Sequence, residues 1–382
     1  MPSKISKRRV TMTDIAKKLG ISQQAVSAAL SGSTSTVAVG RATKARVRKL
    51  AEEMNYVPDF AAKSLSTKKS YLVAFLCRES FHLDILVPCL DGLQRQLENN
   101  GYSVLTSIHG NQASDELAHI DLAMARRADA IVLTPAIDSD GRTNAGALLK
   151  LSQRFGIPVI QVANKVIPEL PCVQLSRANG VKRCMERLYE LGHTRIVHLT
   201  YQDYQDEVHP GFHLKAREHW LAYESAMRGR GLEPLVIDIP SLGSAWCGDG
   251  QIVPAIDTLL KMTPRPTAIL AHNDRLAYPA AAALAARGIS IPRDLAMIGY
   301  DDLCPEGLGI KRLSTVNQPF ATVGEETAKL VLEMIAGRPG RDIVLDPVFV
   351  ERDLQAGQVP LGKKCDPPAV MLNRGASYNT VG

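Results

Sequence analysis

The sequence lacks several features that would define a membrane, secreted or catalytic protein. It has no run of about 18 or more apolar residues, which indicates that no segment spans a membrane. The basic N-terminus is not followed by the apolar stretch of a secretory signal, so we expect none. The patterns GxSxG, HExxH, the phosphate-binding P-loop and a GxGxxG after a first strand are all absent. These absences weigh against membrane insertion, secretion and several common enzyme chemistries.

Cysteine is sparse and never arranged in a motif. The seven cysteines are odd in number, scattered, and never spaced as CxxC; they stand at positions 77, 89, 172, 184, 247, 304 and 365. This distribution is typical of reduced thiols that pack in a cytoplasmic protein. We therefore expect a cytoplasmic protein without a disulfide framework.

The chain is long, and its charge is unevenly distributed. Its 382 residues suggest two or three domains, and 45% hydrophobic with 22% charged residues is ordinary globular composition. Residues 1–69 hold 14 lysines and arginines against 4 acidic residues, whereas residues 70–382 hold 31 against 35. A basic head on a mildly acidic body is typical of a phosphate-binding module attached to another domain. The alternative, a solvated basic tail, is weakened by apolar residues at helical spacing among these charges.

Residues 11–32 have the pattern of two short helices joined by a tight turn. We expect Thr13 to cap the first helix and Gly20 to end it, since a residue with positive φ is wanted there. Ser22 is expected to cap the second helix, which runs to Leu30.

Small apolar residues, Ala16 and Val26, fall where these two helices would cross. This is the layout of a helix-turn-helix, whose second helix enters the DNA major groove. An ordinary α-hairpin is the alternative for this stretch alone. A third, basic helix is expected over residues 40–54 and ends before Pro58, because the residue before a proline avoids the helical region. Residues 58–69 can form a short linker helix that is marginal in isolation.

From residue 70 onward, short apolar strands alternate with helices. A first series of strands is expected at Tyr71–Cys77, Tyr102–Ile108, Ala130–Thr134 and Pro158–Val162, and a second at Val173–Leu175, Arg195–Thr200, Leu235–Ile239, Thr267–Ala271 and Leu295–Tyr300. Helices are expected near 86–100, 114–127, 145–155, 178–191, 215–230, 250–262 and 274–287. The alternation predicts parallel sheets with right-handed crossovers. Two series predict two doubly wound lobes, with a ligand cleft at the carboxyl ends of their strands.

A set of short motifs runs along nearly the whole chain. In the head they are Thr13-Asp-Ile-Ala, Gly20-Ile-Ser, Val26-Ser, Leu30-Ser-Gly32, Asn55-Tyr-Val-Pro58 and Ala62-Lys-Ser-Leu65. Further along they are Leu191-Gly-His-Thr-Arg-Ile196, Asn273-Asp274, Ile291-Pro-Arg-Asp-Leu295, Ile298-Gly-Tyr-Asp-Asp302 and Leu313-Ser-Thr-Val-Asn-Gln-Pro319. Together, and in this order, they resemble the lactose-repressor (LacI/GalR) family of transcriptional regulators.

The resemblance implies a multidomain chain. Its parts would be an all-α helix-turn-helix head at 1–57, a hinge helix at 58–69, a two-lobed α/β effector and dimerisation domain like periplasmic sugar-binding proteins at 70–355, and a flexible tail at 356–382. Lobe 1 would span about 70–166 and 303–338, and lobe 2 about 167–302 and 339–355, with crossings near 165–170, 301–304 and 337–342. The implied function is a sequence-specific DNA-binding regulator, most simply a repressor, whose operator affinity a sugar-like effector modulates.

The same resemblance implies which residues bind DNA. Gln23 and Gln24 match the base-reading positions of the recognition helix, where glutamine amides can pair with adenine. Ala28 stands at a third base-reading position and offers only an apolar contact, for example to a thymine methyl. Leu65 matches a leucine that wedges into the minor groove and bends the duplex. The full set is Thr11, Ser22, Gln23, Gln24, Ser27, Ala28, Tyr56, Ala62, Lys63 and Leu65.

Effector-binding positions are implied in the same way, with departures from the family pattern. Ala163 stands where an aspartate is usual, and His219 stands where the family has an effector-binding arginine. Arg217, two residues away, is a possible substitute, and Asp274 is expected only to cap the following helix. The candidate set is Phe81, His82, Arg217, His219, Trp246, Asn273, Asp301 and Gln318.

Other classes of function receive less support. His209, His213 and His219 are too interrupted by Pro210-Gly211 for a helical metal pair, so we expect no metal and no cofactor. A sugar-processing enzyme could use Asp301 and Asp302, but no partner acid is identifiable by spacing. A transport protein of the same two-lobed kind would have a signal peptide and no basic head. We therefore expect a non-enzymatic homodimer that binds a pseudo-palindromic double-stranded operator, a small-molecule effector and no membrane.

Overall fold

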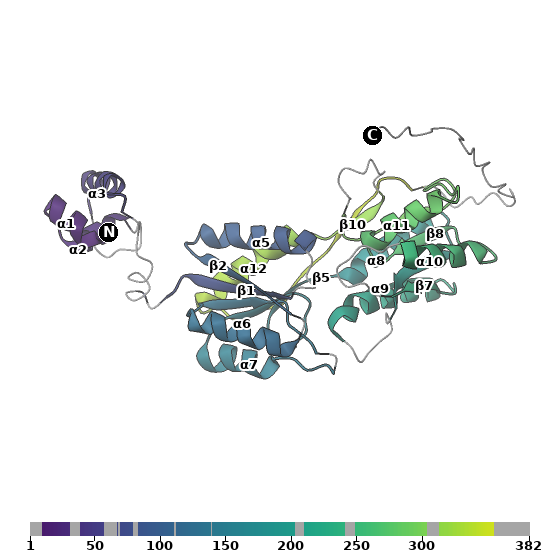
Figure 1. Ribbon diagram of the computed structural model, residues 1–382, viewed down its shortest axis with the longest axis horizontal. Coiled ribbons are helices and arrows are strands. Elements are labelled where there is room, and N and C mark those ends of the chain that lie inside the picture. Colours follow the sequence, from purple (N-terminus) through teal and green to yellow (C-terminus); the bar gives the residue numbers. More distant parts are fainter. Residues whose placement is uncertain are drawn as a thin grey trace, which may run out of the picture. The chain divides into compact units, whose positions relative to one another are not determined.

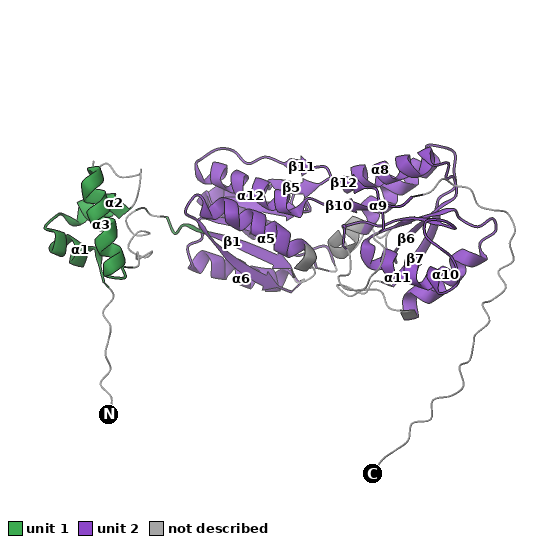
Figure 2. Cartoon of the chain, turned by 90° about the horizontal axis from the view of Figure 1, so that it is seen from above, with its two compact units in different colours: residues 1–72 green, residues 73–382 purple. Residues whose placement is uncertain are grey.

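The structure is a computed structural model, and it divides into two compact units. It describes residues 10–30, 39–56, 67, 69–78, 83–110, 112–138, 140–202, 210–240, 249–303 and 313–354. The units are residues 1–72 and 73–382, coloured separately in Figure 2. Most of the predicted hinge helix and the predicted tail lie outside the described residues, so both stay predictions.

The smaller unit holds three helices around one small core. They are α1 (Met12–Leu19), α2 (Gln23–Leu30) and α3 (Arg41–Glu53), as Figure 1 shows. Seven of their buried side chains form one cluster: Ile15, Ala16, Val26, Ala29, Val47, Leu50 and Ala51. The predicted helix crossing is confirmed, because Ala16 is 6% and Val26 0% exposed. The basic side chains of Arg41, Arg46 and Arg48 remain on the solvent side of α3.

A six-stranded sheet forms the first lobe of the larger unit. Its strands are β1 (Leu72–Arg78), β2 (Ser103–His109), β3 (Ala130–Leu133), β4 (Val159–Ala163), β5 (Cys172–Leu175) and β11 (Ile343–Leu345), in the order β11-β5-β4-β3-β1-β2. The pairs β1–β3, β3–β4, β4–β5 and β5–β11 are parallel. Helices α5 (Leu83–Glu98) and α12 (Phe320–Ile335) cover one face, and α6 (Ala113–Ala125) and α7 (Ala145–Leu149, continued by a π-helical turn Lys150–Arg154) cover the other (Figure 1).

Two glycines allow α5 and α12 to pack closely. A Cβ atom on Gly324 would overlap the carbonyl oxygen of Cys89, and one on Gly92 would overlap that of Ala321. Each glycine therefore lets the backbone of the other helix approach. Burial raises the pKa of the Cys89 and Cys172 thiols to about 12, which fits the packing role predicted for cysteine.

A four-stranded parallel sheet forms the second lobe. Its order is β7 (Leu235–Ile239), β6 (Ile196–Tyr201), β8 (Ala268–Ala271) and β9 (Ala296–Ile298). Side chains of α8 (Arg177–Glu190) and α9 (Pro210–Arg228) pack with one face of this sheet. Those of α10 (Asp249–Lys261) and α11 (Asp274–Ala285) pack with the other. The prediction of two doubly wound α/β lobes is thus confirmed.

The chain passes between the lobes later than predicted at all three crossings. The strand Val173–Leu175 was expected in the second lobe, but as part of β5 it pairs with β4 and β11 in the first. The second passage lies beyond β10 (Thr315–Asn317), because Gly299 and Asp301 donate backbone hydrogen bonds to Ser314 and Val316, both at 2.9 Å. The third follows β11, and β12 (Val348–Val350) then pairs antiparallel with β10.

A buried glutamine explains the first of these corrections. The side-chain oxygen of Gln161 accepts hydrogen bonds from Val166 N at 2.8 Å and Ile167 N at 2.7 Å. Its amide nitrogen donates to the carbonyl oxygens of Ile167 at 2.8 Å and Leu170 at 3.1 Å. These bonds fold the short connection after β4 back on itself, so the next strand joins the same sheet. Within the part of the chain that the structure describes, no helix combines the length and hydropathy needed to cross a bilayer.

Candidate DNA-binding and effector sites

The first helix of the head is fixed at its start by a capping box. The backbone nitrogen of Thr11 donates to Asp14 Oδ2 at 2.9 Å, and Asp14 N donates to Thr11 Oγ1 at 3.3 Å. The predicted cap at Thr13 is therefore wrong by two residues, because Asp14 at the third helical position reaches back to Thr11. Gly20 ends the helix in the left-handed region at φ 65°, as predicted.

The second helix presents its first turn to solvent. Ser22 Oγ accepts a hydrogen bond from Ala25 N at 3.1 Å, which confirms it as the cap. Gln23 and Gln24 are exposed, and Ser27 is half-buried on the same side. Thr13 Oγ1 donates to Gln23 Oε1 at 3.4 Å, a long bond between the first helix and the predicted base reader. Amide groups at the start of an exposed second helix can reach base edges in a major groove.

The other residues predicted to contact DNA differ in their exposure. Thr11 is exposed and Tyr56 is half-buried against the three-helix core. Ala28 is only 2% exposed, so in this structure its methyl group is not available for the expected contact with a base. Sequence position on the helix suggested exposure, but packing covers this side chain. The hinge residues Ala62, Lys63 and Leu65 lie outside the described residues.

Asn273 connects two strand ends of the second lobe. Its side-chain oxygen accepts from Leu276 N at 3.1 Å and so caps α11. Its amide also lies 3.2 Å from the hydroxyl of Tyr201, the last residue of β6. The cap is thus Asn273, and the expectation that Asp274 would serve as the cap is wrong.

Asp274 is instead buried beneath the crossing strand. It is 1% exposed, accepts from Leu303 N at 2.7 Å, and accepts from Thr315 Oγ1 at 3.0 Å. Burial, followed by the nearby charge of Asp301, raises the pKa of Asp274 well above its usual value. Asp301 has φ 98°, a left-handed conformation that is unusual for aspartate, and Gln318 donates to its carboxylate. The side chains of Asp274, Asp301 and Gln318 therefore lie between the end of β9 and the point after β10 where the chain passes to the first lobe.

His219 lies in a cluster of aromatic rings at the same strand ends. It is 3% exposed, with its ring centroid 4.3 Å from that of Tyr300 and 4.6 Å from that of His272. His272 in turn meets Tyr201 edge-on at 5.3 Å. Arg217, the possible substitute for the family arginine, is half-buried on α9. Flat rings at this place can pack against a ring of a bound molecule.

The structure brings Tyr201, His219, Asn273, Asp301 and Gln318 to one end of the second lobe and its crossing. Of these, Tyr201 was not predicted. The candidates Phe81, His82 and Trp246 lie outside the described residues, and so does His209. Among the side chains that the structure does describe, no group of three histidine, cysteine or acidic residues could hold a metal ion.

Several buried polar atoms at strand ends have no hydrogen-bond partner among the residues that the structure describes. They are His109 Nε2 at the end of β2, Asn164 Oδ1 just after β4, Arg177 Nε just after β5, Thr200 Oγ1 near the end of β6, and Gln318 Oε1 after β10. Leaving such groups unsatisfied is costly, so each calls for a further partner, such as a water, an ion or a ligand. Apart from Gln318, sequence reasoning did not select these residues for effector binding.

Arg177 has the most informative surroundings of this set. It is 2% exposed, and its Nη2 donates to the carbonyl oxygen of Ala163 at 3.3 Å. Its Nη1 lies 3.2 Å from Glu218 Oε2, on the helix that carries His219. The hydroxyl of Tyr300 donates to the Arg177 carbonyl oxygen at 3.3 Å. The side chain therefore touches the end of β4 in one lobe and α9 in the other.

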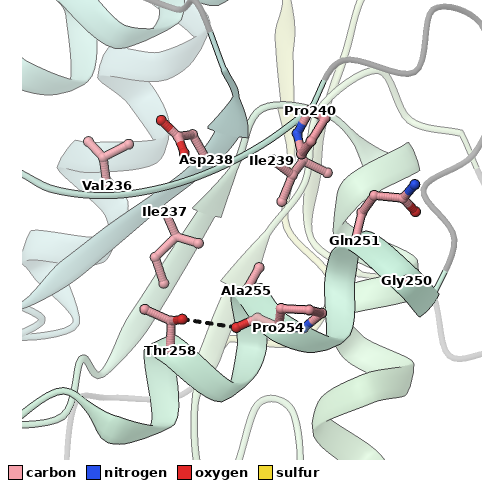
Figure 3. Close-up of a pocket in the computed structure, with 10 residues that line it drawn as sticks. All are labelled: Val236, Ile237, Asp238, Ile239, Pro240, Gly250, Gln251, Pro254, Ala255 and Thr258. Atoms are coloured by element: carbon pink, nitrogen blue, oxygen red, sulfur yellow. Dashed lines mark hydrogen bonds between the residues drawn. The ribbon is translucent and has the colours of Figure 1, made fainter.

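A separate pocket of about 490 Å³ lies along the edge of the second sheet (Figure 3). It is bounded by β7 and α10, through Val236, Ile237, Asp238, Ile239, Pro240, Gly250, Gln251, Pro254, Ala255 and Thr258. The hydroxyl of Thr258 is occupied within the helix, donating to the Pro254 carbonyl at 2.9 Å. None of the predicted effector residues lines this pocket.

Comparison with known proteins agrees with both units. The family model for bacterial regulatory proteins of the lacI family matches residues 11–59, and that for a periplasmic binding protein-like domain matches residues 185–353. The HTH-type transcriptional repressor CytR of Escherichia coli (strain K12) is 27% identical over 346 residues, which cover 88% of this chain and 93% of CytR. The repressor PurR of Vibrio atlanticus is 26% identical over 356 residues, covering 90% and 97%.

Solved structures agree with the fold. The lac repressor dimer bound to operator and the anti-inducer ONPF has a TM-score of 0.70 at 20% identity, covering 92% of this chain and 100% of that one. The CelR–cellobiose complex has a TM-score of 0.58 at 21% identity, covering 91% and 100%.

A helix-turn-helix head joined to a two-lobed α/β core defines a bacterial regulator with a periplasmic-binding-protein-like domain. The chain belongs to the lacI family of bacterial regulatory proteins. It is a DNA-binding transcriptional regulator.

Proposed function

We propose that this regulator is a cytoplasmic repressor that binds a pseudo-palindromic operator as a homodimer. The observation that carries the proposal is the exposed first turn of α2, with Gln23 and Gln24 held on a rigid three-helix core. Two such helices, one from each subunit, would enter adjacent major grooves. Thr11, Ser22, Ser27 and Tyr56 would support them, with Ala62, Lys63 and Leu65 in the hinge. The relatives CytR and PurR are named repressors, and the lac repressor binds operator as a dimer, which supports this proposal.

The larger unit would bind a small polyhydroxyl effector at its strand ends. His219, Asn273, Asp301 and Gln318 supply rings and hydrogen-bonding groups there, and Arg217 flanks them. Similar proteins have been solved with cellobiose and with ribose, which supports a sugar-like ligand. An effector that favours one arrangement of the lobes would change operator affinity, and operator would change effector affinity by the same factor.

The acidic pair at the end of β9 supports a binding role over a hydrolytic one. Asp302 Oδ1 lies 2.6 Å from Arg352 Nη2, and Asp302 Oδ2 accepts from Asn317 at 3.1 Å. Asp301 accepts from Gln318. Both oxygens of the Asp302 carboxylate are therefore engaged by side chains of the protein itself. We therefore propose that the protein acts by binding and not by turnover of a sugar.

DNA recognition can be tested with an operator selected from random sequences. Selection from a random duplex library by the full-length protein should yield a pseudo-palindrome. Gln23→Ala and Gln24→Ala should each bind the selected sequence about tenfold or more weakly, since one bidentate base contact is worth about 1–3 kcal/mol. Gln153→Ala, which changes an exposed glutamine of the larger unit, is the matched control and should bind normally. Selection of no consensus, or normal binding by both head variants, would disprove recognition by α2.

A further inference from the structure

We infer that Arg177 and Asn164 together bind a hydroxyl group of an uncharged polyhydroxyl effector. This inference rests on the proposed function and specifies the chemistry of its ligand. Neither residue was predicted from sequence to bind effector. Both lie at the carboxyl ends of neighbouring strands of the first lobe, which is where parallel α/β sheets bind their ligands.

The two side chains are neighbours because β4 ends in an unusual backbone conformation. Ala163, the last residue of β4, has φ 68°, which is rare for a residue with a side chain. Its carbonyl oxygen accepts the hydrogen bond from Arg177 Nη2, and Asn164 follows it directly in the chain. The guanidinium and the carboxamide are therefore held beside the same peptide unit.

Both groups are buried with one hydrogen-bonding atom unused. Arg177 is 2% and Asn164 is 8% exposed. Within the described parts of the chain, Arg177 Nε, a donor, has no partner, and neither does Asn164 Oδ1, an acceptor. A hydroxyl group accepts one hydrogen bond and donates another, so a single sugar hydroxyl can satisfy both atoms. Thr200 and Gln318, which also have unpartnered oxygens at strand ends, offer further acceptors for a ligand with several hydroxyls.

Charge around Arg177 favours an uncharged ligand over an anion. The guanidinium is already paired with Glu218 at 3.2 Å, so its positive charge is balanced within the protein. An anionic group at Arg177 Nε would meet the negative charge of Glu218 across the same guanidinium. The Glu218 side chain is 48% exposed, so water screens part of this repulsion, and the remainder disfavours an anion relative to a neutral group. A neutral hydroxyl gains the hydrogen bond without this repulsion.

Ligand-dependent unfolding of the full chain tests the chemical class. Uncharged probes would be D-ribose, D-glucose and cellobiose at 50 mM, compared with two anions at the same concentration, D-ribose 5-phosphate and D-glucuronate. At least one uncharged probe should raise the unfolding temperature by about 2 °C or more, and both anions should raise it less. A larger shift with an anion, or no shift with any uncharged probe, would overturn the inference.

Variants test the two residues with the uncharged probe that gives the largest shift. Asn164→Ala removes the acceptor, and Arg177→Lys keeps the charge but removes Nε, so each should weaken binding tenfold or more. Asn164→Asp retains an acceptor oxygen and should bind within threefold of the unchanged protein. Arg187→Lys alters a surface arginine of the same helix and is the matched control. Should Arg177→Lys fail to fold, Asn164→Ala decides, and unchanged affinity in it would refute the assignment.

DNA binding separates failure of this inference from failure of the proposed function. Without ligand, Asn164→Ala should bind the selected operator as tightly as the unchanged protein, but a sugar should no longer change that affinity. A protein that responds only to phosphorylated or acidic sugars would overturn the inference and leave the repressor proposal standing. A protein that selects no operator would overturn the repressor proposal, while the sugar-binding measurements above would stand or fall independently.

Discussion

The head and the α/β core place the side chains that we propose as functional in opposite ways. In the head, Gln23 and Gln24 project into solvent from a helix whose other face is packed. In the core, Asn164, Arg177 and Gln318 are buried at strand ends, each with a polar atom that no described residue satisfies. A DNA groove is a large external surface, so its reader must protrude. A small molecule is enclosed by its binding site, so the protein groups that bind it are buried and are satisfied when it is bound.

This difference has consequences for stability. The head depends on one small cluster of buried side chains. Among the described residues of the core, further clusters lie on both faces of the second sheet and on one face of the first. A single substitution that disrupts this cluster should therefore unfold the head, whereas the core should tolerate a comparable loss.

The largest expected effect is a charge placed in the core of the head. Val26 is 0% exposed, so Val26→Asp buries a carboxylate without a partner and should destabilise the head by about 4 kcal/mol. Calorimetry should show the head transition lost and the core transition unchanged, with DNA binding abolished. Gln24→Asp, an exposed change on the same helix, should leave the head folded. An equal shift of the core transition would show that the two units do not unfold independently.

The sequence predicted the positions of the strands well, but it predicted less well which sheet each strand joins. The nine predicted strands lie within about two residues of observed ones, because buried parallel strands are short apolar runs between turns. The lobe predicted for Val173–Leu175 was nevertheless wrong, since so short a strand does not specify which sheet it joins. The side chain of Gln161, which turns the chain back, looks like any strand residue in the sequence. The strands Ile343–Leu345 and Val348–Val350 are too short for their pattern to stand out.

The prediction of site residues was limited in the same way, because contacts between distant segments cannot be read from the sequence. Gln23, Gln24, Asn273 and Gln318 were selected because the resemblance marks single positions. Arg177 was missed, although an arginine just after an apolar strand is a usable signal when its burial is known. Burial and unsatisfied atoms arise from contacts between segments distant in sequence, so no local pattern contains them.

A smaller expected effect is the pH dependence of the stability of the core. Burial lowers the pKa of His198 in β6 to about 4, from the usual value near 6.5. The unfolded chain binds a proton there below pH 6.5 and the folded chain does not, so stability falls as pH drops from 6.5 to 4. The full loss approaches about 3 kcal/mol at 1.36 kcal/mol per pKa unit.

The matched measurement compares the unchanged protein with His198→Asn. Asparagine can still donate to the Leu270 carbonyl oxygen, which His198 Nδ1 contacts at 3.0 Å, but it does not titrate. Asp274 acts in the opposite sense, because its raised pKa makes stability fall as pH rises. Taking the difference between the two proteins removes this shared contribution. Identical pH profiles would show that folding does not lower the pKa of His198.

The smallest expected effect concerns the start of α1 and decides between two threonines. Thr11→Ala removes the oxygen that accepts from Asp14 N and should destabilise the head by about 1 kcal/mol. Thr13→Ala should cost less, since its hydroxyl makes only the 3.4 Å bond to Gln23. Head unfolding followed by circular dichroism measures both. The reverse order would restore Thr13 as the cap. The expected order would show that the helix begins where Asp14 reaches back, with no change in the core transition.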